Sequence, residues 1–379
     1  MFDLSYWNEF DFIAGIVYFI IAVILSLKMS TKRMFFFLLS IFHFFITLYY
    51  WSYSLTNVAD STMYFETTKY THLGWFDIFG PDTSFIRFIL FPFLHFFNLN
   101  YLGAFFIFST FGLLGFYFLF RVLLVIVSKN NYKWLYVLFL PQLHFWTCAL
   151  GKDSLIFMQM SLLLSLWFFN KKLIYYLLPF AIIGFVRIHI SLLMVVGYGI
   201  AIFLLDSKKI SPFKKVLLVG VFGGIFMALF PYLADRINVN NVMEIVEYAN
   251  NESVKYVSSG GSSVDLSSSS LPIKFFSYLF RPLFFDIWSF LALEASVENL
   301  FWLYMFFVVS YSIFRDKKYY SINKFNVLAP YLVAMIIVIP MSYALSNLGI
   351  AMRQKTMIFP LLFHLFIYYK SYKNRLRYE

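Results

Sequence analysis

Long apolar runs separated by short polar segments fill most of this sequence. A helix rises about 1.5 Å per residue, so about 20 mostly apolar residues cross the roughly 30 Å hydrocarbon layer of a bilayer. The pattern therefore predicts an all-α, polytopic integral membrane protein, with residues 1–379 as a single membrane domain. We expect about eleven spanning helices, near residues 11–27, 34–55, 101–127, 134–150, 154–170, 173–187, 189–205, 214–232, 288–314, 325–345 and 355–370.

One boundary in this pattern has two interpretations. Residues 173–187 form a short run, and Arg187 interrupts the apolar sequence directly before the next one. The stretch 173–205 therefore predicts either two helices or one long kinked helix.

Two polar segments are longer than the other connections. Residues 56–100 contain the turn signal Gly80-Pro81-Asp82 and the apolar run Phe85 to Phe97, which predicts an interfacial helix. Residues 233–287 contain a Ser- and Gly-rich run from Ser258 to Ser270, whose composition predicts a mobile loop. Long loops of this kind are often lids or binding segments.

The distribution of charge predicts how the chain lies in the membrane. With 61% hydrophobic and 13% charged residues, the sequence excludes an ordinary soluble protein. A net charge of +11 would suggest nucleic-acid binding in a soluble protein, but 20 of the 30 Lys and Arg residues fall in alternate connections between the predicted spans. Because cytoplasmic loops retain basic residues, we expect the N-terminus outside and the C-terminus in the cytoplasm, with the bilayer and not nucleic acid as partner.

Motifs for soluble enzyme chemistry are lacking. The sequence has no Walker lysine loop, no GxGxxG and no HExxH, and its one cysteine, Cys148, excludes a Cys-based metal site. We therefore expect no cofactor, and a divalent metal has no support. We also expect no discontinuous, repeated helix pair of the kind that many ion-coupled transporters contain.

Charged and polar residues at membrane helices are costly, so each is a candidate functional residue. Taken alone, each such residue is explained equally well by a side chain that reaches the membrane interface or by helix capping. Taken together, they gather at the external ends of the predicted helices, and neither simple explanation favours one side. The candidates are Asp60, Lys152, Asp153, Arg187, His189, Arg281, Asn347 and Arg353.

This residue set suits a lipid diphosphate as substrate. Arg donates two parallel hydrogen bonds to phosphate oxygens and Lys adds a point charge, so Lys152, Arg187, Arg281 and Arg353 are candidates for holding a diphosphate as it leaves. Asp60 is the candidate base for a sugar hydroxyl, and Tyr64 and Trp75 offer faces on which sugars stack. The chemistry would be glycosyl transfer without a nucleotide.

Short motifs strengthen this hypothesis through a resemblance. They are Asp60-Ser-Thr-Met-Tyr64, Phe145-Trp-Thr-Cys-Ala-Leu-Gly-Lys-Asp153, Val186-Arg-Ile-His189, Phe280-Arg-Pro282 and Asn347-Leu-Gly-Ile-Ala-Met-Arg-Gln-Lys355. Over most of its length the chain resembles bacterial O-antigen and capsule repeat-unit polymerases and the wider GT-C type of membrane glycosyltransferase. The resemblance implies a location in the bacterial inner membrane, saccharides linked to a polyprenyl diphosphate as substrates, polysaccharide assembly proteins as partners and a functional Asp in the first external loop, which Asp60 matches.

Two other functions remain open. A flippase or exporter of lipid-linked oligosaccharides would need polar groups along a path from both faces, and the cytoplasmic halves of these helices contain few. A non-catalytic scaffold of a polysaccharide assembly complex would tolerate the loss of Asp60 and of Arg353 equally well.

Overall fold

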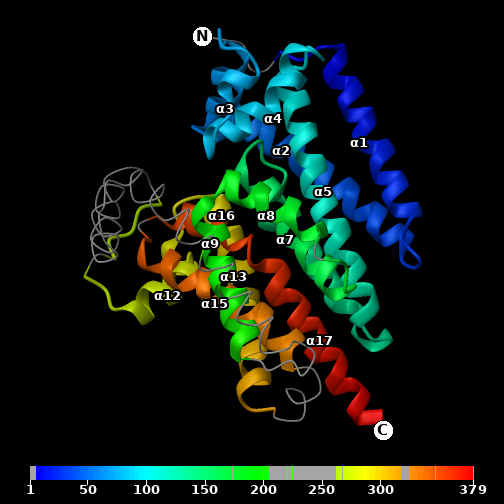
Figure 1. Ribbon diagram of the computed structural model, residues 1–379, viewed down its shortest axis with the longest axis vertical. Coiled ribbons are helices and arrows are strands. Elements are labelled where there is room, and N and C mark those ends of the chain that lie inside the picture. The colour runs from blue at the N-terminus through cyan, green and yellow to red at the C-terminus, as the bar shows by residue number, and fades with distance from the viewer. Residues whose placement is uncertain are drawn as a thin grey trace. The chain divides into compact units, whose positions relative to one another are not determined.

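A computed structural model shows a helical chain that divides into two compact units, Met1–Ile188 and His189–Glu379 (Figure 1). Within the described residues every regular element is a helix, and one isolated bridge pairs Ser263 with Asn347. The structure describes residues 6–172, 174–204, 262–266, 268–316, 324–345 and 347–378, together with Gly220 and Gly224.

The N-terminal unit is built around α5, which packs against α1, α2 and α7. Its helices are α1 (Glu9–Leu27), α2 (Arg33–Thr56), α3 (Asp60–Lys69), η1 (Phe76–Ile78), α4 (Thr83–His95), α5 (Tyr101–Ile126), η2 (Lys129–Phe139), α6 (Pro141–Thr147), α7 (Lys152–Phe168) and α8 (Ile174–Val186).

In the C-terminal unit α12 contacts α13, α15 and α16, and α17 packs against α13 and α15. Its helices are α9, which begins one residue before the unit boundary (Ile188–Leu204), α12 (Leu271–Phe280), η3 (Phe284–Asp286), α13 (Phe290–Phe314), α15 (Lys324–Tyr343), α16 (Leu348–Lys355) and α17 (Phe359–Tyr378).

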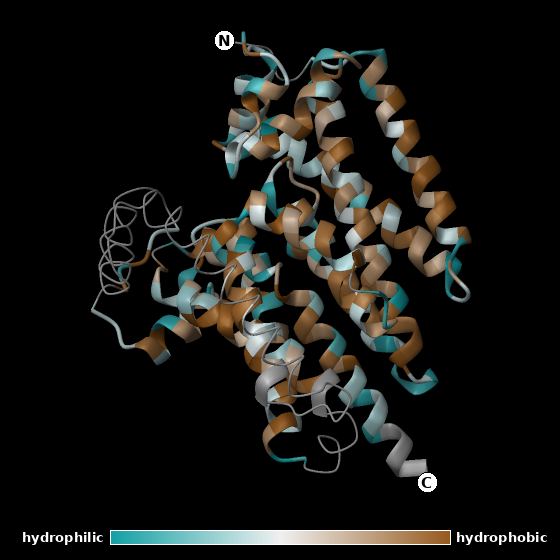
Figure 2. Cartoon of the chain, viewed as in Figure 1, coloured by the Kyte–Doolittle hydropathy of each residue, from teal (hydrophilic) through white to brown (hydrophobic). Residues whose placement is uncertain are grey.

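Among the described residues four helices, α1, α2, α5 and α13, are long and apolar enough to cross a membrane, and the bent pair α6 and α7 makes a fifth if it is one span. Apolar residues cover α1, α2 and α5, with hydrophilic residues at their ends (Figure 2). The predicted all-α membrane protein is thereby confirmed. The full set of eleven spans and the single domain over 1–379 stay predictions, and the predicted span 214–232 lies outside the described residues apart from two glycines.

Small residues explain how α5 packs so closely against its neighbours. Where two helices cross in a membrane, small side chains let the backbones approach. A Cβ at Gly112 would overlap the carbonyl oxygen of Thr147, and a Cβ at Gly115 would come within 2.6 Å of the Phe157 ring. α6 and α7 therefore contact α5 where it has no side chain.

One end of the N-terminal unit is held by the Asp11 carboxylate, which is fully buried. Asp11 Oδ1 accepts hydrogen bonds from the backbone N–H groups of Asn100 (2.7 Å) and Gly103 (3.1 Å), and Oδ2 accepts one from Asn8 N–H (3.0 Å). One side chain thus satisfies amide donors at the starts of both α1 and α5, where helices leave such donors unpaired.

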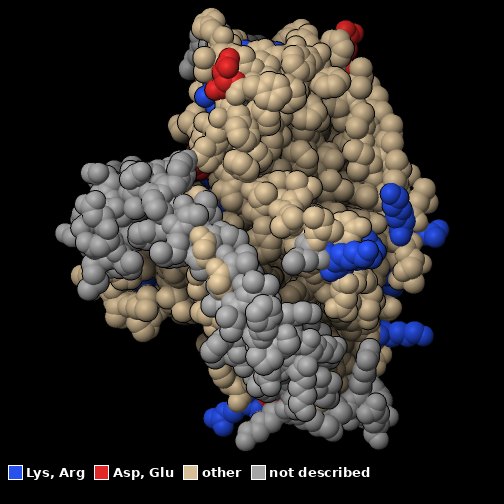
Figure 3. Space-filling model, in the orientation of Figure 1, with Lys and Arg blue, Asp and Glu red and all other residues tan. Residues whose placement is uncertain are grey.

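The opposite end of this unit is basic. Lys32, between α1 and α2, lies 4.3 Å from the centroid of the Tyr132 ring on η2, and Arg121 on α5 lies 5.1 Å from the centroid of Phe169 after α7. On the visible face of this unit, acidic side chains lie at the end where α1 begins, and basic ones lie toward the turn between α1 and α2 (Figure 3). The two ends of the helices thus differ in charge, as the loop pattern predicted.

The structure adds detail to three predicted segments. The predicted span 134–150 is η2 followed by α6, because Pro141 has no N–H and starts a new helix. The stretch 173–205 is two helices that break at Arg187. The segment 56–100 contains α3, η1 and α4, and the described part of 233–287 contains α12, although most of its Ser- and Gly-rich run lies outside the described residues.

Candidate functional site

The main irregularity of the N-terminal unit is the break between α6 and α7. The two helices meet at an angle of 107° across residues 148–151. Gly151 ends this connection, and a Cβ placed there would come 3.1 Å from Cε2 of Tyr64 on α3. The chain therefore turns sharply against an aromatic ring, at a position where no side chain intervenes.

The first turn of α7 presents the positive end of a helix. Gly151 is the N-cap and supplies no side-chain acceptor, so the first amide groups of α7 lack the usual side-chain cap. Lys152 and Asp153 are the first two residues of the helix. Amide groups and the helix dipole at such an end favour an anion.

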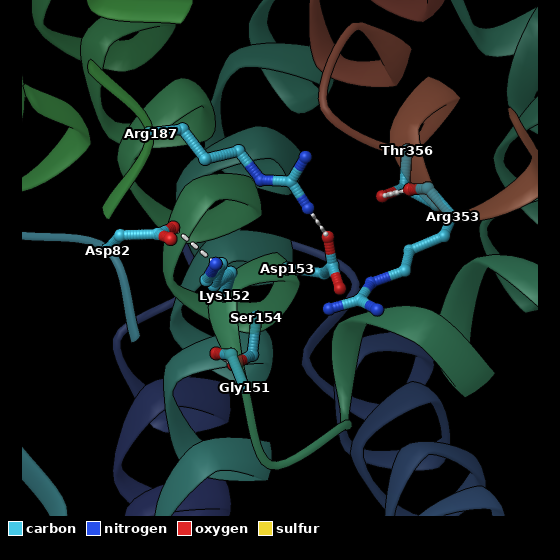
Figure 4. A network of polar contacts seen from close by, with 8 residues as sticks. All are labelled: Asp82, Gly151, Lys152, Asp153, Ser154, Arg187, Arg353 and Thr356. Atoms are coloured by element: carbon cyan, nitrogen blue, oxygen red, sulfur yellow. Dashed lines mark hydrogen bonds and ion pairs between the residues drawn. The ribbon is translucent and has the colours of Figure 1, made fainter. Parts of the chain in front are cut away.

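Two ion pairs surround this end of α7 (Figure 4). Lys152 Nζ pairs with Asp82, which precedes α4, and Arg187 Nη2 lies 2.9 Å from Asp153 Oδ1. The side chains of Arg187 and Asp153 are 10% and 1% exposed, whereas those of Lys152 and Asp82 are 16% and 29% exposed. One pair is therefore enclosed by protein and the other is open at one edge.

The backbone of Asp82 is held in an unfavourable conformation. Its φ of 64° and ψ of −123° belong to a region that residues with a Cβ rarely adopt. Asp82 N–H donates to Phe185 O at 2.6 Å, and the Phe85 and Phe185 rings stack with centroids 5.1 Å apart. These contacts with α8 hold the strained residue beside Lys152, and strain of this kind is typical of functional positions.

Arg187 has one buried N–H group that finds no hydrogen-bond acceptor among the described residues. Its Nη2 is used by Asp153, but no described residue accepts a hydrogen bond from its buried Nε. A buried polar atom without a partner costs free energy and calls for an explanation. An anion at the start of α7 would supply the missing acceptor.

Asp60 and Tyr64 both lie on α3, the helix that approaches this break at Gly151. Tyr64 is 2% exposed and contacts the Gly151 position, whereas Asp60 is exposed and is the first residue of α3. Residues four apart on a helix share a face, so Asp60 lies one turn from a residue that touches the break. The N-terminal unit thus brings five predicted site residues into one region: Asp60, Tyr64, Lys152, Asp153 and Arg187.

The other predicted site residues belong to the C-terminal unit. Arg281 donates through Nε (2.9 Å) and Nη2 to the Asp286 carboxylate, so its charge is already paired. Burial raises the pKa of Asp286, but the hydrogen bonds and charge of Arg281, together with the Leu283 N–H, outweigh it and leave that pKa below its usual value. The segment after α12 is therefore closed by a salt bridge.

Asn347 and Arg353 bound the short helix α16. The Asn347 side chain caps α16 by accepting from Ile350 N–H at 3.2 Å, and it also accepts from Ser262 Oγ at 2.9 Å. The Arg353 carbonyl accepts from Thr356 Oγ1 at 2.8 Å, as Figure 4 also shows. His189 is an exposed residue in the first turn of α9.

Two carboxylates that complete the ion pairs were missed by the sequence interpretation. Asp82 was noted only as part of a turn, and Asp286 was not considered. The signal for Asp82 was the Gly80-Pro81-Asp82 turn, but nothing in the sequence indicates that its side chain reaches Lys152, 70 residues later.

Within the described ranges no group of three or more His, Cys, Asp or Glu residues is placed to hold a metal ion. The expectation that the protein needs no cofactor stays a prediction. Comparison of the chain with protein-family models, with curated proteins and with solved structures gives no match.

Proposed function

We propose that this chain is a membrane glycosyltransferase, a repeat-unit polymerase of a surface polysaccharide, that uses saccharides linked to a polyprenyl diphosphate. The observation that supports it most is the start of α7, where Lys152 and a partly unsatisfied Arg187 meet uncapped helix amides. The proposal includes the eleven-span topology, with the N-terminus outside and the site at the external face of the bacterial inner membrane.

The diphosphate would bind at the start of α7. One phosphate would accept hydrogen bonds from Arg187 Nε and the α7 amides, while Lys152 would exchange the Asp82 carboxylate for the second phosphate. Asp82 can give way because it is partly exposed and its backbone is strained. The two cations would then stabilise the negative charge that grows on the leaving diphosphate.

The transfer step needs a base and a leaving group. An acceptor sugar hydroxyl attacks the anomeric carbon of the donor, forming the new glycosidic bond while the bond from that carbon to the phosphate oxygen breaks. The electron pair of the broken bond leaves with the polyprenyl diphosphate, and the hydroxyl proton passes to the Asp60 carboxylate. His189, Arg281, Asn347 and Arg353 remain predicted contacts for the saccharide or the diphosphate.

A flippase for lipid-linked oligosaccharides is the second candidate, and one observation favours it. Discontinuous helices whose N-terminal ends point at anionic groups are typical of transporters, and α6 and α7 form such a helix. A scaffold role remains the third candidate.

Purified protein in liposomes, supplied with lipid-linked repeat units on one face, separates these functions. Longer products indicate a polymerase, movement of the substrate between leaflets without extension indicates a flippase, and neither indicates a scaffold. We expect extension, and we expect Asp60→Asn to slow it by about 100-fold or more because the base is lost.

Asp77→Asn is the matched control, since Asp77 is another exposed carboxylate in the same external segment and its side chain only accepts from Gly74 N–H. Extension at an equal rate in both variants and in wild type would remove Asp60 from the mechanism. Substrate movement between leaflets without longer products would contradict the polymerase function and support the flippase function.

A further inference from the structure

Two histidines meet in the interior of the N-terminal unit, away from the start of α7. His43 on α2 and His144 on α6 are both fully buried, and their Nδ1 atoms lie 2.8 Å apart. Titratable groups inside membrane helices are rare and frequently belong to proton pathways.

The other nitrogen of each ring faces a backbone carbonyl. His43 Nε2 lies 3.1 Å from Ser109 O, and His144 Nε2 lies 2.6 Å from Leu138 O. A carbonyl oxygen can only accept, so each of these contacts is a hydrogen bond only if its Nε2 donates. Neutral imidazole has one N–H, and with Nε2 protonated its Nδ1 is left with a lone pair.

The three contacts of this pair therefore need three hydrogens, whereas two neutral imidazoles supply two. We infer that His43 and His144 bind one additional proton between their Nδ1 atoms, which makes the pair a buried proton-binding site with a charge of +1. Without that proton the pair has two hydrogens for three contacts, so either the two Nδ1 lone pairs face each other or one Nε2 lone pair faces its carbonyl oxygen.

The surroundings can accommodate a shared cation. The Phe116 ring stacks on His144 with centroids 4.3 Å apart, and the Phe42 ring lies 4.9 Å away, edge to face with His144. Aromatic faces stabilise cations, and two charged N–H groups donate to carbonyls more strongly than neutral ones. The charge is also spread over two rings.

Neighbouring helices contribute no charged side chain to the pair among the described residues. Two titratable groups of the adjoining segments are uncharged: the Cys148 thiol, at the C-cap of α6, lies beside Thr47, and the Tyr18 hydroxyl on α1 donates to Ser40 O. From α2 and α5, the Thr47 and Ser109 hydroxyls bond each other at 2.7 Å. The bound proton is therefore not balanced by a carboxylate in this part of the unit.

The shared proton forms a hydrogen bond that links α6 to α2. His144 begins the last turn of α6, directly before the break that leads to Lys152. Loss of the proton would leave one of the three contacts of the pair without a hydrogen and would loosen the segment before the break. This inference rests on hydrogen-bond geometry alone and does not depend on the proposed glycosyl transfer.

Nitrogen-15 NMR of the full-length protein in detergent, labelled only at its six histidines, tests the site directly. At pH 7 we expect one ring pair with both Nε2 atoms protonated and a scalar coupling between the two Nδ1 atoms through a shared proton. Two separate neutral rings in the wild-type protein at pH 7, with no coupling, would overturn the inference. This measurement needs no variant.

The consequence for α6 is tested through the single native cysteine. Cys148 is fully buried and lies one turn after His144. Loss of one hydrogen bond in His43→Gln should speed its reaction with a maleimide at pH 7 by about fivefold. His95→Gln is the control, because His95 Nε2 contacts Thr68 O elsewhere in the unit. Equal rates in wild type and His43→Gln would contradict the link between the proton and α6.

Discussion

Arg187→Met is expected to destabilise the protein by about 3–5 kcal/mol, the cost of removing one partner from a buried ion pair. Asp153 is 1% exposed and Arg187 10% exposed, so the remaining buried carboxylate would lose the Arg187 guanidinium that contacts it at 2.9 Å. The effect should appear as a lower thermal unfolding midpoint in detergent.

Two further variants show whether the broken ion pair causes the loss of stability. The double variant Arg187→Met with Asp153→Leu removes both charges and should recover most of the lost stability, because apolar replacements of a buried pair are often neutral or stabilising. Arg33→Met, at an exposed arginine of the same unit, should change little. A double variant as unstable as Arg187→Met alone would show that Asp153 does not depend on Arg187.

Gly112→Ala is expected to cost about 3 kcal/mol or more, because overpacking a tight interface forces backbone movement. The added Cβ would overlap the backbone carbonyl oxygen of Thr147 and lie 2.9 Å from His43 Nε2. Neither atom is the end of a flexible chain that could move aside. The variant should therefore unfold at a lower temperature and separate α6 from α5.

Gly220→Ala is the matched control, since an added Cβ there meets no atom of the described residues within 4 Å. It should leave the unfolding midpoint unchanged or slightly higher, as alanine favours a helix over glycine. Equal midpoints for wild type and Gly112→Ala would show that α5 and α6 are not in close contact at this position.

The longest helices could be predicted from the sequence. The predicted spans 11–27, 34–55, 101–127 and 288–314 correspond to α1, α2, α5 and α13 within two residues at each end. Each is a long apolar run bounded by polar residues, and hydropathy over about 20 residues detects such runs well. The basic loops beside α1, α5 and α7 also lie together, as the sign of their charge suggested.

The break between α6 and α7 could not be predicted in the same way. Residues 134–150 are mostly apolar, so hydropathy gives one span where the chain forms a 3-10 helix, a short helix and a sharp bend. The expectation that the chain lacks a discontinuous, repeated helix pair stays a prediction, since the described residues contain one bent pair and no second copy of it. At the end of the bend Gly151 lies close to the Tyr64 ring, an approach between distant segments that hydropathy does not detect.

The composition of the site was predicted better than its electrostatics. Lys152, Asp153 and Arg187 were singled out because charges are rare at membrane helices, and the structure brings them together at the start of α7. The carboxylate that pairs with Lys152 affects how much positive charge is available there, and Asp82 reaches Lys152 through a tertiary contact across 70 residues that no local pattern encodes. The histidine pair was missed for the same reason, since His43 and His144 are 101 residues apart.

Binding of a lipid diphosphate at the start of α7 can be measured by thermal unfolding in nanodiscs. Polyprenyl diphosphate at about 100 times its Kd should stabilise the wild-type protein by about 2.7 kcal/mol, and uncharged polyprenol should not. Lys152→Gln and the double variant at Arg187 and Asp153 should lose this stabilisation, whereas Lys129→Gln, at the basic end of the same unit, should keep it. Equal stabilisation of all four proteins by the diphosphate, or an equal effect of polyprenol, would contradict a diphosphate site at the start of α7.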